Sequence, residues 1–399
     1  MINRPTDLSG RFRSRVRAVQ TVSDVMRSVF RGTGFKCLLH EKRNLDDDPH
    51  SEYADVDQRI RGKIHEYPRL DHVKEVMIQG LDEKTPTPLT YFMDGSRRVF
   101  RFSDIILNDG RYFPVLAGQV GVAVLGRNAD GSMTPQRDYC KYQNLLIFPD
   151  TVEQPDREAV RKGVQKAMGS RKCEFIIDDY QTGSSGGNAS EDYINKGTKK
   201  ILDRMHDLEL GAIVRMMENR MLSGDRMLVI DGSLQFRREV LNRLGIPITE
   251  IALQLVNVIG ISKSFTPSQP VSGMTKGRHL GAILQDMEFG HRTPVFRAGE
   301  DVFTDTLGVW YLRIRDRKAM TSPLEGVIKV ECLARNQRER DNGIDADRVD
   351  TISAYILSER SVTPYGSDNR WANHLYPIFL TESYLKSGFR SDTEFKGLL

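Results

Sequence analysis

The strongest constraint on the fold is an alternation of helical and strand-like segments in the middle of the chain. Apolar residues recur at helical spacing over residues 194–222, and residues 226–230 then form a short apolar-rich segment typical of a buried strand. A second amphipathic segment covers 236–244, and another apolar strand-like segment covers 251–261. Two buried strands joined by a helix usually pair in parallel, so this region predicts an α/β fold.

The region before this alternation has a different pattern. A β-type run over residues 89–93 ends at Asp94-Gly95-Ser96, and further apolar runs cover 99–102 and 112–125. Asn108-Asp109-Gly110 separates the last two runs and is a strong hairpin signal. We therefore predict three consecutive antiparallel strands, each bounded by a turn.

The remaining segments complete a mixed sheet with flanking helices. The patterns predict helices over 153–168 and 345–360 and at the C-terminus, strands over 173–177, 309–314 and 326–333, and a flexible loop over 182–190. The expected fold class is α/β, with antiparallel strands first, parallel strands next, and helices on both sides.

The N-terminal segment is rich in arginine. Between residues 4 and 31 there are seven arginines and only Asp7 and Asp24 as acids. Two interpretations are open. The arginines can neutralise nucleic-acid phosphates, or the segment is an amphipathic helix that packs through Val19, Val22, Met26 and Val29.

Charge density and periodicity suggest how the chain is divided. Residues 41–70 are highly charged with little periodicity, which is typical of an exposed linker. We predict a basic, helical N-terminal arm and linker over 1–87 and one main domain over 88–399, with a helical and loop insertion at about 151–195.

Composition excludes several classes of protein. Of the 399 residues 39% are hydrophobic, and no stretch approaches the roughly 18 apolar residues of a membrane span. Residues 1–20 lack the apolar centre of a signal peptide, so we expect a cytoplasmic protein. The four cysteines are far apart, which argues against a zinc knuckle. A net charge of +4 permits a nucleic-acid partner without requiring one.

Two carboxylates carry the chemical hypothesis. Asp94 and Asp231 each follow an apolar strand-like run and precede Gly-Ser. If the two strands are neighbours, the carboxylates converge, and a divalent cation would offset their repulsion because Mg²⁺ and Mn²⁺ prefer oxygen ligands. Such ions activate water and stabilise the leaving oxygen in phosphodiester cleavage. Antiparallel strands with one Asp, a long helix with an acid, and a parallel strand with a second Asp are the order found in RNase H-like nucleases.

Several blocks together resemble the NurA family of DNA nucleases, which work with the HerA hexameric translocase. Their order and approximate spacing match from about residue 88 to 390. The blocks are Phe92-Met93-Asp94-Gly95-Ser96, Asp207-Leu208-Glu209-Leu210-Gly211-Ala212, Met227-Leu228-Val229-Ile230-Asp231-Gly232-Ser233-Leu234, Ile259-Gly260-Ile261-Ser262-Lys263-Ser264 and Tyr376-Pro377-Ile378-Phe379-Leu380.

The resemblance implies a role for each block. Asp94, Glu209 and Asp231 would bind Mn²⁺ or Mg²⁺, Lys263 would contact the scissile phosphate or a carboxylate, and Tyr376 would be the tyrosine of the terminal motif. It further implies an RNase H-like fold, a homodimer, DNA as substrate, and a HerA-like hexameric ATPase as partner in DNA end processing or defence against foreign DNA.

Some assignments stay open at this stage. Glu218 is the alternative to Glu209 as the helical carboxylate. Tyr384 stands where the family carries a histidine after its tyrosine, and Glu382 is a possible oxygen ligand in its place. The other histidines, including His374, are not spaced as a metal-binding set, and we expect them at the surface or in supporting positions. The alternative function is a catalytically weakened, nucleic-acid-binding adaptor of a HerA-type ATPase.

Overall fold

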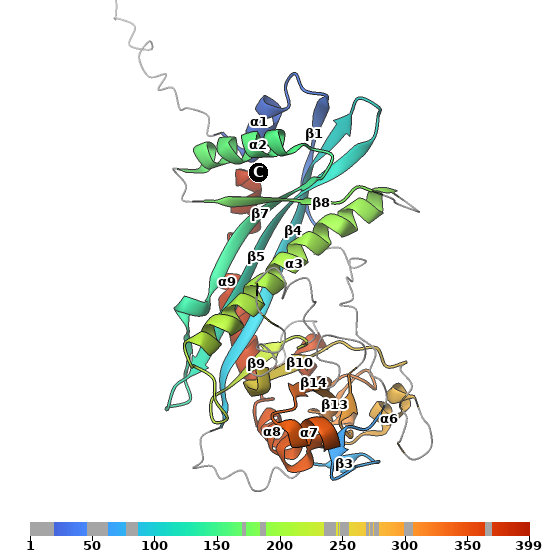
Figure 1. The fold of residues 1–399 in the computed structure, drawn as a ribbon. Helices are drawn as coiled ribbons and strands as arrows, with labels where there is room; N and C mark the ends of the chain where they lie inside the picture. Colours follow the sequence, from blue (N-terminus) through green and yellow to red (C-terminus); the bar gives the residue numbers. More distant parts are fainter. Residues whose placement is uncertain are drawn as a thin grey trace, which may run out of the picture.

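The computed structural model shows an α/β protein with one large mixed sheet flanked by helices (Figure 1). It describes residues 20–45, 63–76, 87–169, 173–183, 189–234, 255–268, 279–298, 306–363 and 369–399, with isolated positions at 245, 247, 271 and 274. The predicted helix over 236–244 lies outside these residues, as do residues 1–19 and most of the predicted loop over 182–190.

Thirteen of the described strands form the main sheet. Its hydrogen-bonded path runs β3 (Lys74–Glu75), β11 (His291–Arg292), β13 (Leu307–Arg313), β14 (Val327–Leu333), β10 (Val258–Ser262), β9 (Met227–Asp231), β4 (Leu89–Leu107), β5 (Tyr112–Arg127), β7 (Lys141–Pro149) and β8 (Phe175–Tyr180). Three further strands attach at the side, β1 (Phe35–Asn44) to β4, β6 (Met133–Pro135) to β5 and β12 (Phe296–Arg297) to β13.

The first hairpin corrects one prediction. Strands β4 and β5 form a single long antiparallel pair, so the two runs predicted as separate strands over 89–93 and 99–102 are one strand. Asp94 therefore lies within β4 and not at its end. The cause is the partner strand: Asp94 pairs with Ala123, and the apolar β5 keeps the polar Asp-Gly-Ser triplet extended. The predicted turn at residues 108–110 is present, with Gly110 at φ 85°.

The parallel pairing predicted for the segments of β9 and β10 is present, and β4 is the further neighbour of β9. Strand β9 pairs in parallel with β4, and β10 pairs in parallel with β9. Strands β13 and β14 then pair antiparallel with each other, and β14 pairs antiparallel with β10. Antiparallel and parallel pairing thus meet at β4, the strand that carries Asp94.

Three helices cover the sheet near this junction, one on one face and two on the other. Helix α3 (Ala189–Glu218) packs on one face, where its Leu210 joins the same core cluster as Met93 and Ile230. Helices α8 (Ala346–Ser358) and α9 (Tyr376–Ser387) pack on the other face, and Ile378 of α9 shares a cluster with Phe92. Figure 1 shows α3 lying along β4 and β5.

The remaining helices lie at the periphery. They are α1 (Val22–Val29), α2 (Gln154–Met168), α6 (Leu280–Asp286), α7 (Gln337–Asn342), α10 (Asp392–Leu398) and the 3-10 turns η1 (Arg137–Tyr139), η3 (Leu255–Asn257), η4 (Arg317–Ala319) and η5 (Asn369–Asn373). Within the part of the chain that the structure describes, none of the helices has the length and apolar character needed to cross a membrane.

Helix α1 confirms part of the predicted apolar stripe. Thr21 and Asp24 form a reciprocal capping box at its start. Val22 and Met26 are fully buried in a cluster shared with α2. Strand β1, from the segment predicted as an N-terminal arm, pairs with the far half of β4 and so belongs to the main sheet.

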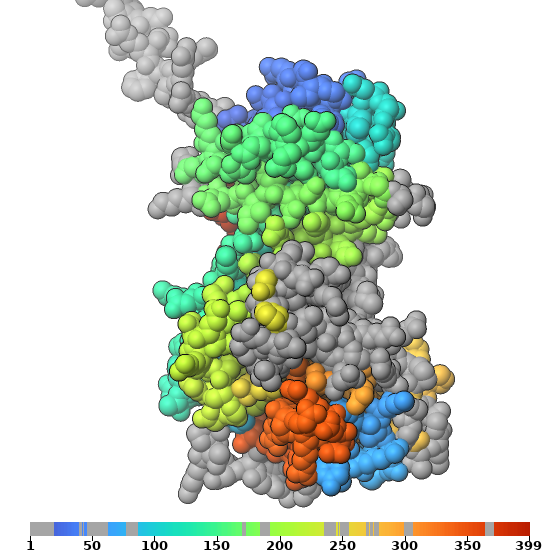
Figure 2. Space-filling model, in the orientation of Figure 1, coloured from blue at the N-terminus to red at the C-terminus, as the bar shows by residue number. Residues whose placement is uncertain are grey.

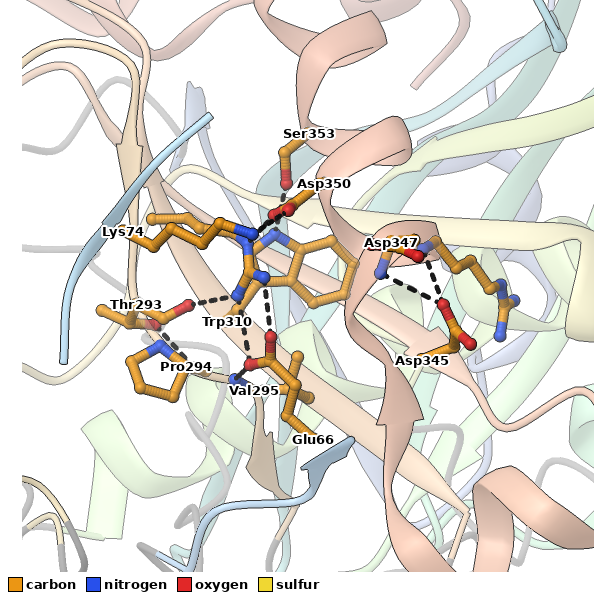
Figure 3. A network of polar contacts seen from close by, with 12 residues as sticks. Glu66, Lys74, Thr293, Pro294, Val295, Trp310, Asp345, Asp347, Asp350 and Ser353 are labelled. Carbon is orange, nitrogen blue, oxygen red and sulfur yellow. Dashed lines mark hydrogen bonds and ion pairs between the residues drawn. The ribbon is translucent and has the colours of Figure 1, made fainter. Parts of the chain in front are cut away.

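The segment predicted as an exposed linker contains a buried acid. Glu66 of β2 (Glu66–Tyr67) is 3% exposed, and β2 pairs in parallel with β15 (Ile344–Asp345). Arg292 donates to both Glu66 oxygens at 2.6 and 3.1 Å and to Asp350 at 2.6 Å. Figure 3 shows Glu66, Lys74 and Asp350 converging in this network. In Figure 2, the segment 63–76 (light blue, at the bottom of the view) lies directly against α7 and α8 (orange).

Candidate active site

Strand register places Asp94 and Asp231 side by side. Met93 of β4 is opposite Ile230 of β9, and each aspartate is the next residue of its strand. Asp231 is in turn paired with Ile261 of β10. Since paired residues of adjacent parallel strands point to the same face, the two carboxylates share one face of the sheet.

Alternation along the strands identifies that face. Asp94 lies two residues after Phe92, and Phe92 packs in the cluster that includes α9. Asp94 is 6% exposed. Burial raises the pKa of its carboxyl well above the ordinary value, and the charges of Asp231, Glu382 and Glu209 raise it further, while Lys263 acts in the opposite direction. Three neighbouring acids and one cation thus act on Asp94, in addition to its burial.

Lys263 is that cation. It follows β10, and its Nζ lies 2.6 Å from Oδ2 of Asp231. The Lys263 side chain is 18% exposed and that of Asp231 12%. Burial acts to lower the pKa of Lys263, but the carboxylates of Asp231, Glu382 and Asp94 outweigh it and raise the pKa. Lys263 is therefore a charged ammonium held among acids.

His374 joins this group, although the sequence placed it only at the surface or in support. It is 1% exposed, its Nε2 lies 2.8 Å from Nζ of Lys263, and it is 3.7 Å from Oε2 of Glu382. The preceding residue, Asn373, donates to the Lys263 carbonyl at 3.1 Å. Residues 373 and 374 thus hold Lys263 at its backbone and at its tip. No spacing rule connects positions 263 and 374, and so the sequence carried no signal for this contact.

Glu382 reaches the same group from α9. Burial acts to raise the pKa of its carboxyl, but the charges of Lys263 and Lys386 outweigh this and lower it. Lys386 lies 2.6 Å from Oε1 of Glu382. Glu382 and Tyr384 were the two residues considered in place of the family's histidine, and of these Glu382 faces the site. Tyr384 instead lies beside Tyr142 of β7. Burial and the neighbouring Tyr384 raise the pKa of Tyr142 to about 12.

Glu209 approaches from the α3 side, through a glycine. A Cβ added to Gly95 would lie 2.7 Å from Cδ of Glu209, so a larger residue at position 95 would force this carboxylate to move away from β4. Glu209 is one of the charges that raise the pKa of Asp94. The alternative, Glu218, is exposed at the last residue of α3. Of the two helical acids, Glu209 is therefore the one near Asp94, but it lies on the α3 face of β4, whereas Asp94 and Asp231 point to the α9 face.

The second Asp-Gly-Ser triplet is held in place by a buried acid of β14. Ser233 Oγ and the Leu234 N–H both donate to Oε2 of Glu331, at 2.8 and 2.7 Å. Nζ of Lys329 lies 3.1 Å from the other oxygen of Glu331. Gly260 of β10 allows the backbone at Gly232 to approach closely, because a Cβ at position 260 would lie 2.9 Å from the Gly232 carbonyl oxygen. These contacts fix the backbone immediately after Asp231.

The Tyr376 side chain does not contact the carboxylates of the candidate site. Its side chain is 47% exposed at the start of α9, and its N–H donates to the Glu359 carbonyl at 2.8 Å. Among the residues that the structure describes, no polar contact joins its hydroxyl to Asp94 or Asp231. The role implied for Tyr376 by the resemblance stays a prediction.

Among the described side chains, the site offers a divalent cation only two carboxylate ligands, Asp94 and Asp231. Over the described ranges, no three His, Cys, Asp or Glu side chains are grouped tightly enough to form a metal-binding cluster. Asp94 and Asp231 alone make a two-carboxylate site, which suits Mg²⁺ because that ion keeps several waters and takes further oxygens from phosphates. The raised pKa of Asp94 indicates that additional positive charge would be stabilised there.

Comparison with known proteins adds no assignment. No protein-family model matches the sequence, and no curated protein resembles it closely enough to count as a relative.

Proposed function

We propose that this protein is a metal-dependent deoxyribonuclease of the NurA type with an RNase H-like core. The proposal rests on one observation: Asp94 and Asp231 lie side by side on adjacent parallel strands. Their site is buried, and Lys263 acts there as a cation against several acids. Phosphodiester cleavage by this chemistry needs such a pair of acids beside a cation. The block order from residue 92 to 380 supports the family assignment.

Each residue has a distinct part in this proposal. Asp94 and Asp231 would hold Mg²⁺ or Mn²⁺, and the bound ion would polarise the phosphate and activate water. Glu209 would add its negative charge to the site from the α3 face of β4. Lys263, held by His374, places a positive charge next to Asp231, where charge develops on the phosphoryl oxygens. Asp231 and then Glu382 raise the pKa of Lys263 and so keep it charged. The resemblance further supports a homodimer, a HerA-like ATPase that feeds DNA, and a cytoplasmic location as proposals.

A nuclease assay tests the proposal directly. Purified protein with Mn²⁺ and a HerA-type ATPase should degrade linear DNA, and Asp231→Ala should reduce the rate at least about 100-fold, since one metal-binding carboxylate is lost. Glu209→Gln should also reduce the rate. The matched control on the same helix is Glu218→Gln, which removes an exposed acid and should cleave as fast as the parent. Equal rates for Asp231→Ala and the parent would refute the assignment.

One observation favours a second candidate, a non-catalytic DNA-binding adaptor. The Lys263 ammonium already contacts Asp231 at 2.6 Å, and thus takes part of the space and charge compensation that a metal would supply. Titration calorimetry with Mn²⁺ separates the two functions. A nuclease should give binding heat that Asp94→Ala abolishes and Asp109→Ala, at an exposed turn, leaves unchanged. Absence of heat in the parent protein, together with intact DNA binding, would support the adaptor.

A further inference from the structure

Two arginines lie side by side next to the candidate active site. Arg315 follows β13, and Arg360 follows α8. Nη2 of Arg315 donates to the main-chain carbonyl of Arg360, and its Nε donates to the Ala372 carbonyl at 3.3 Å. Nη1 of Arg360 donates to the Leu357 carbonyl, at the end of α8. Backbone oxygens therefore anchor both side chains.

Neither guanidinium is paired with an acid. Within the described part of the chain, no carboxylate forms an ion pair with Arg315 or Arg360, although Arg127 nearby is paired with Glu359 at 2.7 Å. Burial and then the charge of Arg360 lower the pKa of Arg315. Two adjacent cations without a counter-charge create a local positive potential, which a bound anion would relieve.

Aromatic rings hold the two guanidinium groups. The guanidinium carbon of Arg315 lies 5.2 Å from the centre of the Trp371 ring, and that of Arg360 lies 4.8 Å from the Phe289 ring. Stacking on a ring restrains the plane of a guanidinium, and the N–H groups that do not donate to backbone carbonyls can bind a planar or tetrahedral oxyanion. Phe289 is 36% exposed, so this cluster reaches the protein surface.

The arginine pair is connected to the candidate site through a short segment. Arg315 binds the carbonyl of Ala372, two residues before His374. The residue before Arg360, Glu359, accepts the N–H of Tyr376. The segment from 372 to 376 therefore contacts the arginine pair on one side and Lys263 on the other.

We propose that Arg315 and Arg360 bind a backbone phosphate of the nucleic-acid strand, next to the phosphate that is cleaved. The inference rests on the proposed function, because it takes the strand to run through the site of Asp94 and Asp231. Bidentate donation from guanidinium groups is the strongest form of phosphate recognition by side chains. Because the two groups recognise charge and not base edges, the site holds the strand without sequence preference.

Binding without metal tests this site apart from catalysis. The probe is a fluorescent DNA oligonucleotide measured by anisotropy in EDTA over a series of salt concentrations. For the double variant Arg315→Gln and Arg360→Gln, the slope of log affinity against log salt should fall by about 1 to 2, as expected for one or two lost phosphate contacts. The control Arg161→Gln, on α2 and paired with Glu158, should keep the parental slope.

Further arms separate the other outcomes. Lysine at both positions keeps the charge and should restore most of the slope, which also covers the case in which the glutamine variant does not fold. A parental slope in a folded glutamine variant overturns the proposal, as does a slope that stays low with lysine. If inorganic phosphate raises the melting temperature of the parent but not of the variant, and the DNA slope is unchanged, the site binds free phosphate and the proposal is wrong. Reduced binding without any cleavage by the parent would leave this site standing and refute the nuclease.

Discussion

The Lys263 and His374 pair shows how single residues set the charge of the candidate site. An ammonium has only donors, so Nε2 of His374, 2.8 Å away, must accept and the imidazole must be neutral at that nitrogen. A protonated His374 would bring two cations into contact. The neutral imidazole thus orients the ammonium toward Asp231 without adding a charge of its own.

Asp94 gives a pH-dependent prediction at this scale. Its pKa in the folded protein lies above the ordinary value of 3.8, through burial and then the neighbouring acids. A raised folded pKa contributes stability below the unfolded value and loses it as the pH rises through the folded value. In EDTA at pH 7.5, Asp94→Asn should therefore raise the melting temperature by about 2 °C or more, and the gain should disappear below about pH 4.

The control for this prediction is Asp109. It is an exposed turn residue, and its pKa is lowered by the hydrogen bond from Arg111, so the sign is opposite. Asp109→Asn should leave the melting temperature unchanged or slightly lower at pH 7.5. If Asp94→Asn destabilises the protein at neutral pH, the charge of Asp94 is compensated in the folded state and the site does not hold an excess of negative charge.

At the scale of elements, sequence periodicity predicts most of the sheet but not its long hairpin. The helices α2 and α3 and the strands β9, β13 and β14 agree with the predicted segments within a few residues, because each is bounded by its own turn or cap. Strand β4 does not, since Asp94, Gly95 and Ser96 have low strand propensity and are extended only through their pairing with β5.

The same distinction applies to the candidate site. The proximity of Asp94, Asp231 and Lys263 follows from parallel pairing of β4, β9 and β10. The strand and helix pattern predicts the pairing of β9 with β10, but it leaves open whether β4 is the neighbour of β9. His374, Arg315 and Arg360 instead come from connecting segments. Their positions depend on tertiary contacts such as the Asn373 side chain on the Lys263 carbonyl, which no local pattern encodes. Residues on regular elements were therefore accessible to sequence reasoning, and residues on connections were not.

At the scale of the whole molecule, buried ionic contacts join segments that are far apart in the sequence. Arg292 of β11 is completely buried and binds Glu66, from the N-terminal segment, and Asp350, from α8. The N–H of Val295 donates to the same Glu66 carboxylate at 2.8 Å. The Arg292 side chain thus connects the N-terminal segment, strand β11 of the sheet and helix α8. In the sheet, β11 is connected through β13 to β14 and β10, the strands next to the candidate site.

Removing this arginine should show how strongly the assembly depends on it. Arg292→Ala would leave Glu66 buried without its cation, and a broken buried ion pair typically costs about 3–5 kcal/mol. Urea unfolding should report that loss as a lower midpoint. Arg161→Ala, which breaks the exposed pair with Glu158 on α2, is the matched control and should cost at most about 1 kcal/mol. A loss for Arg292→Ala no larger than the control would mean that Glu66 is solvated or protonated without Arg292. In that case, charge would not hold the β2 segment to the sheet, and its attachment would depend on backbone contacts, among them the β2 and β15 pairing and the hydrogen bond from the His65 N–H to the Val295 carbonyl.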